Sequence, residues 1–262
     1  MKHIYKYIFK TIKSGKIDKK IFFLHLPKCG GMSIKNAIIC LYGLKETLTS
    51  QKNDYLNAAS SKIAGDKLNL DQNKLREYIQ YYYMCDPDMM FVSGHYPFSL
   101  KAFNEFGNDW NYITILREPV SRWISAFFAR KYTKNQISHV KINDSLEEFI
   151  DSYEAVRLGN SYIRQMLVLD ERVKEYSSKD SILKTIDILK RFKLVGILEN
   201  LDQFLNEFEL IFGARPILSR DNTSPVTKKF KDMQINEQIL EKVRELCKPN
   251  VEVYNYFAKR NE

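Results

Sequence analysis

The chain has 262 residues, of which 44% are hydrophobic and 28% are charged, and its formal net charge at pH 7 is +9. This length and composition fit one large α/β domain or two small ones, with enough apolar residues for a full core. The positive charge favours an anionic ligand. Nucleic acid, a phosphorylated cofactor, an acidic glycan and a membrane surface would each satisfy it.

The four cysteines have neither the paired spacing of a metal site nor the density of a disulfide framework, so we expect free thiols in a reducing compartment. No apolar run approaches the roughly 18 residues that a membrane-spanning helix needs. Lys6, Lys10 and Lys13 interrupt the apolar stretch that a signal peptide would require. The sequence therefore predicts a cytoplasmic protein without a membrane span.

Residues 1–20 predict a basic amphipathic helix, because apolar residues share one helical face and lysines lie between them. We expect the apolar face to pack on the helix's own domain. The alternative is contact with an anionic membrane surface.

A short buried strand is predicted over Phe22–Leu26, followed by a Gly30-Gly31 turn and by an apolar-periodic helix that starts at Ser33 and ends near Gly43. A strand, a glycine turn and a helix N-terminus together are typical of phosphate binding, since backbone N–H groups and the helix dipole point at the anion. Lys28 adds a positive charge. It precedes the glycine pair, which excludes a Walker A loop, and Lys35 stands where the Cys-x5-Arg phosphatase pattern needs arginine.

Residues 45–70 are polar and weakly periodic, so we expect a surface excursion there, and a helix follows around Gln72–Tyr83. Another short strand begins at Phe91 and ends in a Gly94-His95 turn. Loops at strand ends of α/β proteins carry chemistry, and histidine has an unperturbed pKa suited to proton transfer near neutrality. The sequence thus offers His95 as a candidate general base.

The segment Asn111–Leu116 predicts a further buried strand, and Pro119 suits the first position of the helix that follows. Arg117 then lies at the carboxyl end of a strand, where ligands bind in open parallel sheets.

The rest of the chain predicts helices over residues 145–191, a strand over 192–199, a helix over 201–212, a polar loop at 220–225, and a C-terminal helix or helix pair over 236–259 interrupted at Pro249. Ser145 and Glu148 have the spacing of a capping box. Because there is no repeat and no clear linker, we expect a single domain over residues 1–262.

Three of these segments resemble motifs of the sulfotransferases that use 3′-phosphoadenosine-5′-phosphosulfate (PAPS). Pro27–Ser33 resembles their 5′-phosphosulfate loop, with Cys29 where threonine is commoner. The later segment meets every specified position of their 3′-phosphate motif, with Arg117, Pro119, Arg122 and Ser125. Gly94-His95-x-x-Phe98 is similar to the segment that carries the histidine base of carbohydrate sulfotransferases.

The resemblance implies a three-layer, P-loop-like α/β fold with a central parallel sheet flanked by helices, PAPS as donor and adenosine 3′,5′-bisphosphate (PAP) as product. It implies that His95 accepts the proton of the acceptor hydroxyl and that Lys28 neutralises the leaving oxygen, so the mechanism needs no metal. The other residues that it implies are Cys29, Gly30, Gly31, Met32 and Ser33 at the 5′-phosphate, Arg117 and Ser125 at the 3′-phosphate, Asn222 and Ser224 over the nucleotide, and Asn160 and Arg164 near the acceptor.

Some alternatives stay open. If His95 is not the base, the candidates are His25, His139, Glu118 and Glu199, of which His25 is expected to be a packed core histidine because it lies in the strand. Cys29, beside Lys28 and a helix N-terminus, is expected to have a lowered thiol pKa, so that its oxidation would block cofactor binding. A carbohydrate hydroxyl is the leading acceptor, and a small hydroxylated or amine metabolite is the alternative.

Other function classes are a phosphoryl transferase, a basic module that binds nucleic acid or acidic glycan, and a sulfotransferase-like protein that binds nucleotide without catalysis. The first lacks the Walker Lys-Ser/Thr pair and an obvious carboxylate site for Mg²⁺. Lys28 and His95 argue against the last. We expect a nucleotide partner and no nucleic acid.

Overall fold

The computed structural model describes residues 15–43, 52–132, 145–218 and 235–259. The chain divides into two compact units. The first consists of Met1–Leu116 with Lys190–Asn222, and the second of Arg117–Leu189 with Thr223–Glu262.

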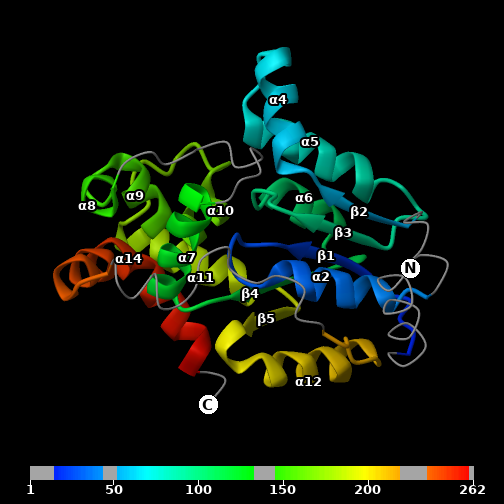
Figure 1. Cartoon of the computed structure of the whole chain (residues 1–262). Helices are drawn as coiled ribbons and strands as arrows, with labels where there is room; N and C mark the ends of the chain where they lie inside the picture. Colours follow the sequence, from blue (N-terminus) through cyan, green and yellow to red (C-terminus); the bar gives the residue numbers. More distant parts are fainter. Residues whose placement is uncertain (1–14, 44–51, 133–144, 219–234, 260–262) are drawn as a thin grey trace. The chain divides into compact units, whose positions relative to one another are not determined.

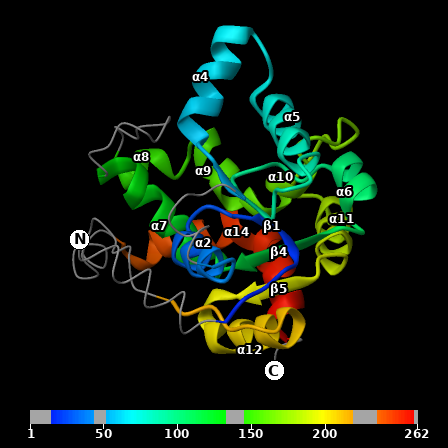
Figure 2. The same ribbon diagram turned by 90° about the vertical axis from the view of Figure 1, so that its right-hand side faces the viewer.

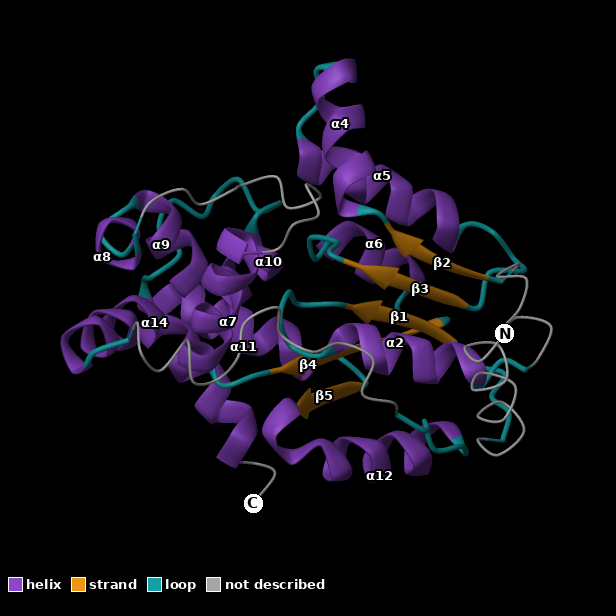
Figure 3. Cartoon of the chain, viewed as in Figure 1, coloured by secondary structure: helices purple, strands orange, loops and turns teal. Residues whose placement is uncertain are grey.

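A five-stranded parallel sheet forms the centre of the first unit (Figures 1 and 3). Its strands are β1 (Lys20–Leu24), β2 (Asn53–Leu56), β3 (Phe91–Gly94), β4 (Trp110–Leu116) and β5 (Leu194–Ile197), in the spatial order β2-β3-β1-β4-β5. Figure 3 shows their arrowheads pointing the same way. The predicted central parallel sheet is therefore confirmed, and four of its strands match predicted strands to within a few residues.

The middle strands are buried on both faces, which explains why they appear in the sequence as nearly continuous apolar runs. Phe22 and Phe23 of β1 are fully buried, and Ile113 and Ile115 of β4 are as well. Thr114 is a polar residue in this core, and its hydroxyl donates a hydrogen bond to the backbone oxygen of Leu24 on the neighbouring strand at 2.7 Å. The strand β1 begins at Lys20, and residues 15–19 are not helical, so the predicted N-terminal helix does not extend through 15–20.

The sheet of the first unit is flanked by the helices α2 (Gly31–Cys40), α4 (Ala58–Leu68), α5 (Gln72–Met84), α6 (Leu100–Phe106) and α12 (Leu201–Phe212). Figures 1 and 2 both show α4 and α5 side by side, and Figure 1 shows them next to the β2 edge of the sheet. The surface excursion predicted for 45–70 is wrong over residues 53–68, where β2 and α4 form. The side chain of Asn57 caps α4 by accepting from the backbone N–H groups of Ala59 and Ser60.

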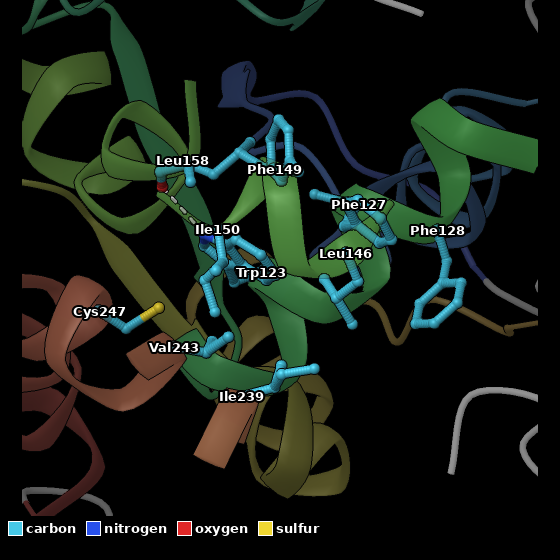
Figure 4. Packing of buried hydrophobic residues seen from close by; sticks show 12 residues of the cluster. Trp123, Phe127, Phe128, Leu146, Phe149, Ile150, Leu158, Ile239, Val243 and Cys247 are labelled. Carbon is cyan, nitrogen blue, oxygen red and sulfur yellow. Dashed lines mark hydrogen bonds between the residues drawn. The ribbon is translucent and has the colours of Figure 1, made fainter. Parts of the chain in front are cut away.

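The second unit is helical, and its elements are α7 (Pro119–Tyr132), α8 (Leu146–Phe149), α9 (Tyr153–Gly159), α10 (Ser161–Leu167), α11 (Lys179–Lys190, whose last residue is assigned to the first unit) and α14 (Glu237–Ala258). Its core gathers aromatic and aliphatic side chains of α7, α8, α9 and α14 around Trp123 (Figure 4). The indole of Trp123 donates to the backbone oxygen of Ala155 at 3.0 Å. The capping box of Ser145 and Glu148 is present as predicted.

The predicted interruption of the C-terminal helix at Pro249 is wrong, because α14 is one helix from Glu237 to Ala258 with the proline inside it. A proline removes one backbone hydrogen bond from a helix interior, and packing can outweigh that loss. Val243, Cys247, Asn250 and Val253 around this position are fully buried. None of the helices in the described parts of the chain is long and apolar enough to cross a membrane.

Candidate active site

The loop between β1 and α2 turns sharply, because two of its residues have a left-handed backbone conformation. Lys28 has a left-handed backbone with φ of 69°, and Gly30, the residue before α2, has φ of 74°. Glycine adopts that conformation without strain, whereas Lys28 does not. The N–H of Ser33 donates to the Gly30 oxygen at 3.2 Å and closes the first helical turn. The structure thus forms the strand, turn and helix that the sequence predicted.

The N-terminus of α2 has no side-chain cap and no acidic residue in its first turn. Apart from the N–H of Ser33, its first backbone N–H groups point toward a ligand, and the helix dipole favours an anion there. Met32 and Ser33 are partly exposed in that turn, and Lys28 is partly exposed in the loop. The local structure fits a phosphate or sulfate group.

Cys29 takes a different position from its neighbours in the loop. Its side chain is fully buried, and its Sγ lies 3.8 Å from the backbone oxygen of Pro27. Its backbone N–H donates to the Leu26 oxygen at 3.3 Å, so neither that N–H nor the thiol is presented to a ligand. Such burial disfavours the expected oxidation of this thiol, since oxidants act on accessible thiolates.

Two histidines meet at the carboxyl ends of β1 and β3. The parallel register pairs Leu24 with Gly94, so the residues that follow, His25 and His95, become neighbours. The N–H of His25 donates to the Gly94 oxygen at 3.0 Å, and Nδ1 of His95 lies 2.7 Å from the His25 oxygen. The two ring centroids are 4.6 Å apart. His25 is buried, as predicted, whereas His95 is partly exposed.

The surroundings of the pair keep both rings neutral. Burial lowers the pKa of His25 well below its ordinary value, and the positive charges around it lower it further. Burial also lowers the pKa of His95, although its bond to the His25 carbonyl raises it and the charge of Arg76 lowers it. Both shifts favour the uncharged form of the imidazole.

Arg76 of α5 fixes the backbone at His95. Its Nη1 donates to the His95 oxygen at 3.0 Å, its Nε to the Ser61 hydroxyl at 3.1 Å and its Nη2 to the Ala58 oxygen at 3.3 Å. The same guanidinium thus links the His95 turn to α4. Sequence reasoning missed Arg76 because nothing in its local pattern marks it.

Lys35 of α2 lies over the ring of Tyr55, with Nζ 4.6 Å from the ring centroid.

In the second unit, Arg117 directly follows β4, and two hydrogen bonds fix its backbone. The hydroxyl of buried Tyr162 accepts from the Arg117 N–H at 3.1 Å and donates to the Arg117 oxygen at 2.5 Å. The carboxylate of Glu118 accepts from the N–H groups of Val120 and Ser121 and caps α7. The Arg117 side chain is partly exposed, as is Ser125 in the second turn of α7. Glu118 therefore has a structural task as a helix cap.

Other residues of the second unit that match family motifs are engaged inside it. Arg122 is buried, donates from Nη2 to the Leu158 oxygen, and lies over the Tyr162 ring. Asn160 is also buried and donates from Nδ2 to the Val156 oxygen at 3.2 Å. Arg164 stacks on Tyr176, with its guanidinium carbon 4.6 Å from the ring centroid. The burial of Asn160 favours a structural role, and the acceptor assignment of Asn160 and Arg164 stays a prediction.

The structure brings Lys28, the first turn of α2 and His95 into one unit, at neighbouring strand ends. Arg117, Ser125, Asn160 and Arg164 belong to the other unit. Asn222, Ser224 and His139 lie outside the described residues, and Glu199 is exposed in the single turn Leu198–Asn200. Within the described ranges, no three or more His, Cys, Asp or Glu residues gather in a way that could hold a metal ion.

The sequence matches a known protein family. A family model described as the sulfotransferase family matches residues 16–257. A sulfotransferase from Alicyclobacillus acidocaldarius has a similar structure, with 15% identity, a TM-score of 0.47, and coverage of 92% of this chain and 95% of that one. The mouse sulfotransferase SULT7A1, solved as a complex with PAP, has 14% identity, a TM-score of 0.36, and coverage of 92% and 68%. The comparison with curated protein sequences found no significant match.

Proposed function

The chain belongs to the sulfotransferase family, and from that membership we propose that it transfers the sulfuryl group of PAPS to a hydroxyl of a carbohydrate acceptor and releases PAP. The observation that carries the proposal is the pairing of His95 with the His25 carbonyl, in the same unit as an uncapped helix N-terminus that suits the donor's anionic groups.

The tautomer of His95 supports its role as general base. A backbone carbonyl oxygen only accepts hydrogen bonds, so the Nδ1 atom that lies 2.7 Å from it carries the proton. The lone pair is then on Nε2, which is the atom able to take a proton from an acceptor hydroxyl. The lowered pKa of His95 keeps that lone pair available at neutral pH.

The first turn of α2 would hold the 5′-phosphosulfate through the backbone N–H groups of Gly31 and Met32 and the hydroxyl of Ser33. Lys28, at the start of the turn, would neutralise the charge that develops on the bridging oxygen. In the second unit, Arg117 would bind the 3′-phosphate with its guanidinium and Ser125 with its hydroxyl. Tyr162 supports this assignment, since it fixes the Arg117 backbone from both sides.

In the proposed reaction, the acceptor oxygen forms a bond to sulfur while His95 Nε2 takes its proton. The bond between sulfur and the bridging phosphate oxygen breaks, and that oxygen leaves with the electron pair as part of PAP. Sulfuryl transfer resembles phosphoryl transfer in needing in-line geometry and stabilised charge. A hydroxyl suits a histidine base, and the net charge of +9 suits an anionic sugar.

The test is transfer of labelled sulfate from PAPS to a panel of acceptors that contains neutral glycans, carboxylated glycans, small phenols and amines. We expect label in glycan hydroxyls and none with the His95→Ala variant. Label only in phenols or amines would refute the carbohydrate acceptor. No label in any acceptor, combined with no binding of PAP, would refute the proposed activity itself.

A further inference from the structure

The side chain of His25 lies between His95 and the first turn of α2. The proposed reaction uses only the backbone oxygen of His25, which holds His95. His25 is 4% exposed. On one side its ring stacks on Phe23, with centroids 5.7 Å apart and an interplanar angle of 11°. On another side it meets the ring of His95, with centroids 4.6 Å apart. The base therefore rests against a second imidazole.

The same ring also contacts the first residue of α2. A Cβ built on Gly31 would lie 2.1 Å from Cδ2 and 2.3 Å from Nε2 of His25. Gly31 is a helical residue and is not among the glycines with positive φ, so its backbone would accept alanine. What requires glycine here is the space that the His25 ring fills. The ring is thus wedged between the start of the phosphate-binding helix and the base.

An imidazole is a costly side chain for this place. Among the described residues, Nδ1 of His25 is buried without a hydrogen-bond partner. A buried polar atom that is left unpaired lowers stability, and a phenyl ring would avoid that cost.

We propose that His25 is a positioning residue, whose ring sets the orientation of the His95 imidazole relative to the first turn of α2. This rests on the proposed function, in which His95 is the base and α2 holds the donor. A small rotation of the base would move Nε2 away from the acceptor proton, and misplacement of about 1 Å is enough to slow an enzyme roughly a hundredfold.

The test uses the steric contact between Gly31 and His25 in a double-mutant cycle. Four proteins are compared, namely the wild type, His25→Ala, Gly31→Ala and the double variant. Gly31→Ala forces the ring to move, so we expect it to lower kcat roughly tenfold and to shift the NMR resonances of His95. In the His25→Ala background the new methyl group fills vacated space, so Gly31→Ala should cost less than threefold and leave the His95 resonances in place.

The matched control is His25→Phe, which keeps a ring of similar size. We expect it to recover most of the activity that His25→Ala loses, and Gly31→Ala should again be harmful in this background. Equal effects of Gly31→Ala in all three backgrounds would overturn the proposal. So would a His25→Phe variant as impaired as His25→Ala, because the ring would then not be the part that matters. Thermal unfolding of each variant verifies that it is folded.

The NMR measurement of the His95 resonances tests this proposal separately from the proposed function, because it needs no nucleotide. If the wild type does not bind PAP, the proposed function fails, and the His95 resonances still report whether Gly31 acts on His95 through the ring. If the resonances show that coupling but His95→Ala retains its activity, the contact is real and His25 positions no base, which also overturns the proposal.

Discussion

Nδ1 of His95 lies 2.7 Å from the backbone oxygen of His25. The contact depends on the register of β1 and β3, which pairs Leu24 with Gly94 and so places the next two residues side by side. Because the acceptor is a backbone atom, substitution of the His25 side chain leaves the tautomer of His95 unchanged. The identity of the base and the role of the His25 ring can therefore be tested separately.

Replacing His95 by alanine should remove the proton acceptor and leave the binding of donor intact. A general base contributes roughly 100-fold to 10,000-fold, so we expect kcat to fall by at least about 100-fold, with the affinity for PAP within about threefold of the wild type. Single-turnover transfer and calorimetry measure the two quantities.

His139→Ala is the control for this experiment, since it removes another histidine that the sequence offered as a base. We expect its rate to match the wild type. Transfer by His95→Ala within tenfold of the wild-type rate would mean that another group takes the proton.

Arg117 should discriminate between nucleotides with and without a 3′-phosphate. A hydrogen bond to a charged group is worth roughly 1.5–3 kcal/mol, so Arg117→Ala should weaken PAP binding by about tenfold to a hundredfold. The affinity for AMP, which lacks the 3′-phosphate, should barely change. Arg117→Lys should recover only part of the loss, because lysine cannot form the bidentate contact. An equal loss for PAP and AMP would contradict the assignment of Arg117 to the 3′-phosphate.

The lowered pKa values of His25 and His95 predict that acid destabilises the protein. The folded-state pKa values of His25 and His95 both lie below their ordinary 6.5, so below pH 6.5 the unfolded chain binds more protons than the folded one. Protonation of these two groups therefore lowers the free energy of unfolding as the pH falls from 6.5 through their folded-state pKa values. Burial raises the pKa of Asp54, which acts in the opposite direction.

Urea unfolding at pH 7.5 and 5.5 measures this effect, and comparison with His25→Phe isolates the contribution of one ring. We expect the wild type to lose more stability than the variant between the two pH values. The same pH dependence in both proteins would show that His25 is not held neutral by the fold.

Sequence reasoning found the elements that carry a strong hydrophobic signal and missed those that do not. The strands β1, β3, β4 and β5 are apolar runs, and their bounds were predicted within a few residues. In contrast, β2 is a short edge strand with polar residues, Asn53 and Asp54, so it has no such run. The helix α4 buries only Ser61 and Gly65, which leaves no apolar stripe for periodicity to detect.

The candidate site divides in the same way. The loop around Lys28 and the His95 turn are local patterns, and the sequence located both. The partnership of His25 with His95 depends on which strands are neighbours and in what register, and that information is spread along the chain. A usable signal existed, because each of two predicted strands is followed by a histidine, but only sheet order makes them meet. The tasks of Arg76 and Tyr162 are likewise set by tertiary contacts.

Calorimetric titration of the protein with PAP, the desulfated product of the proposed donor, is the most direct test of the account. We predict saturable binding at one site, weakened in Lys28→Ala and in Arg117→Ala by at least about tenfold each, as expected when a charged contact is lost. Absence of saturable PAP binding, with steeply salt-dependent binding to nucleic acid or acidic glycan in its place, would contradict it.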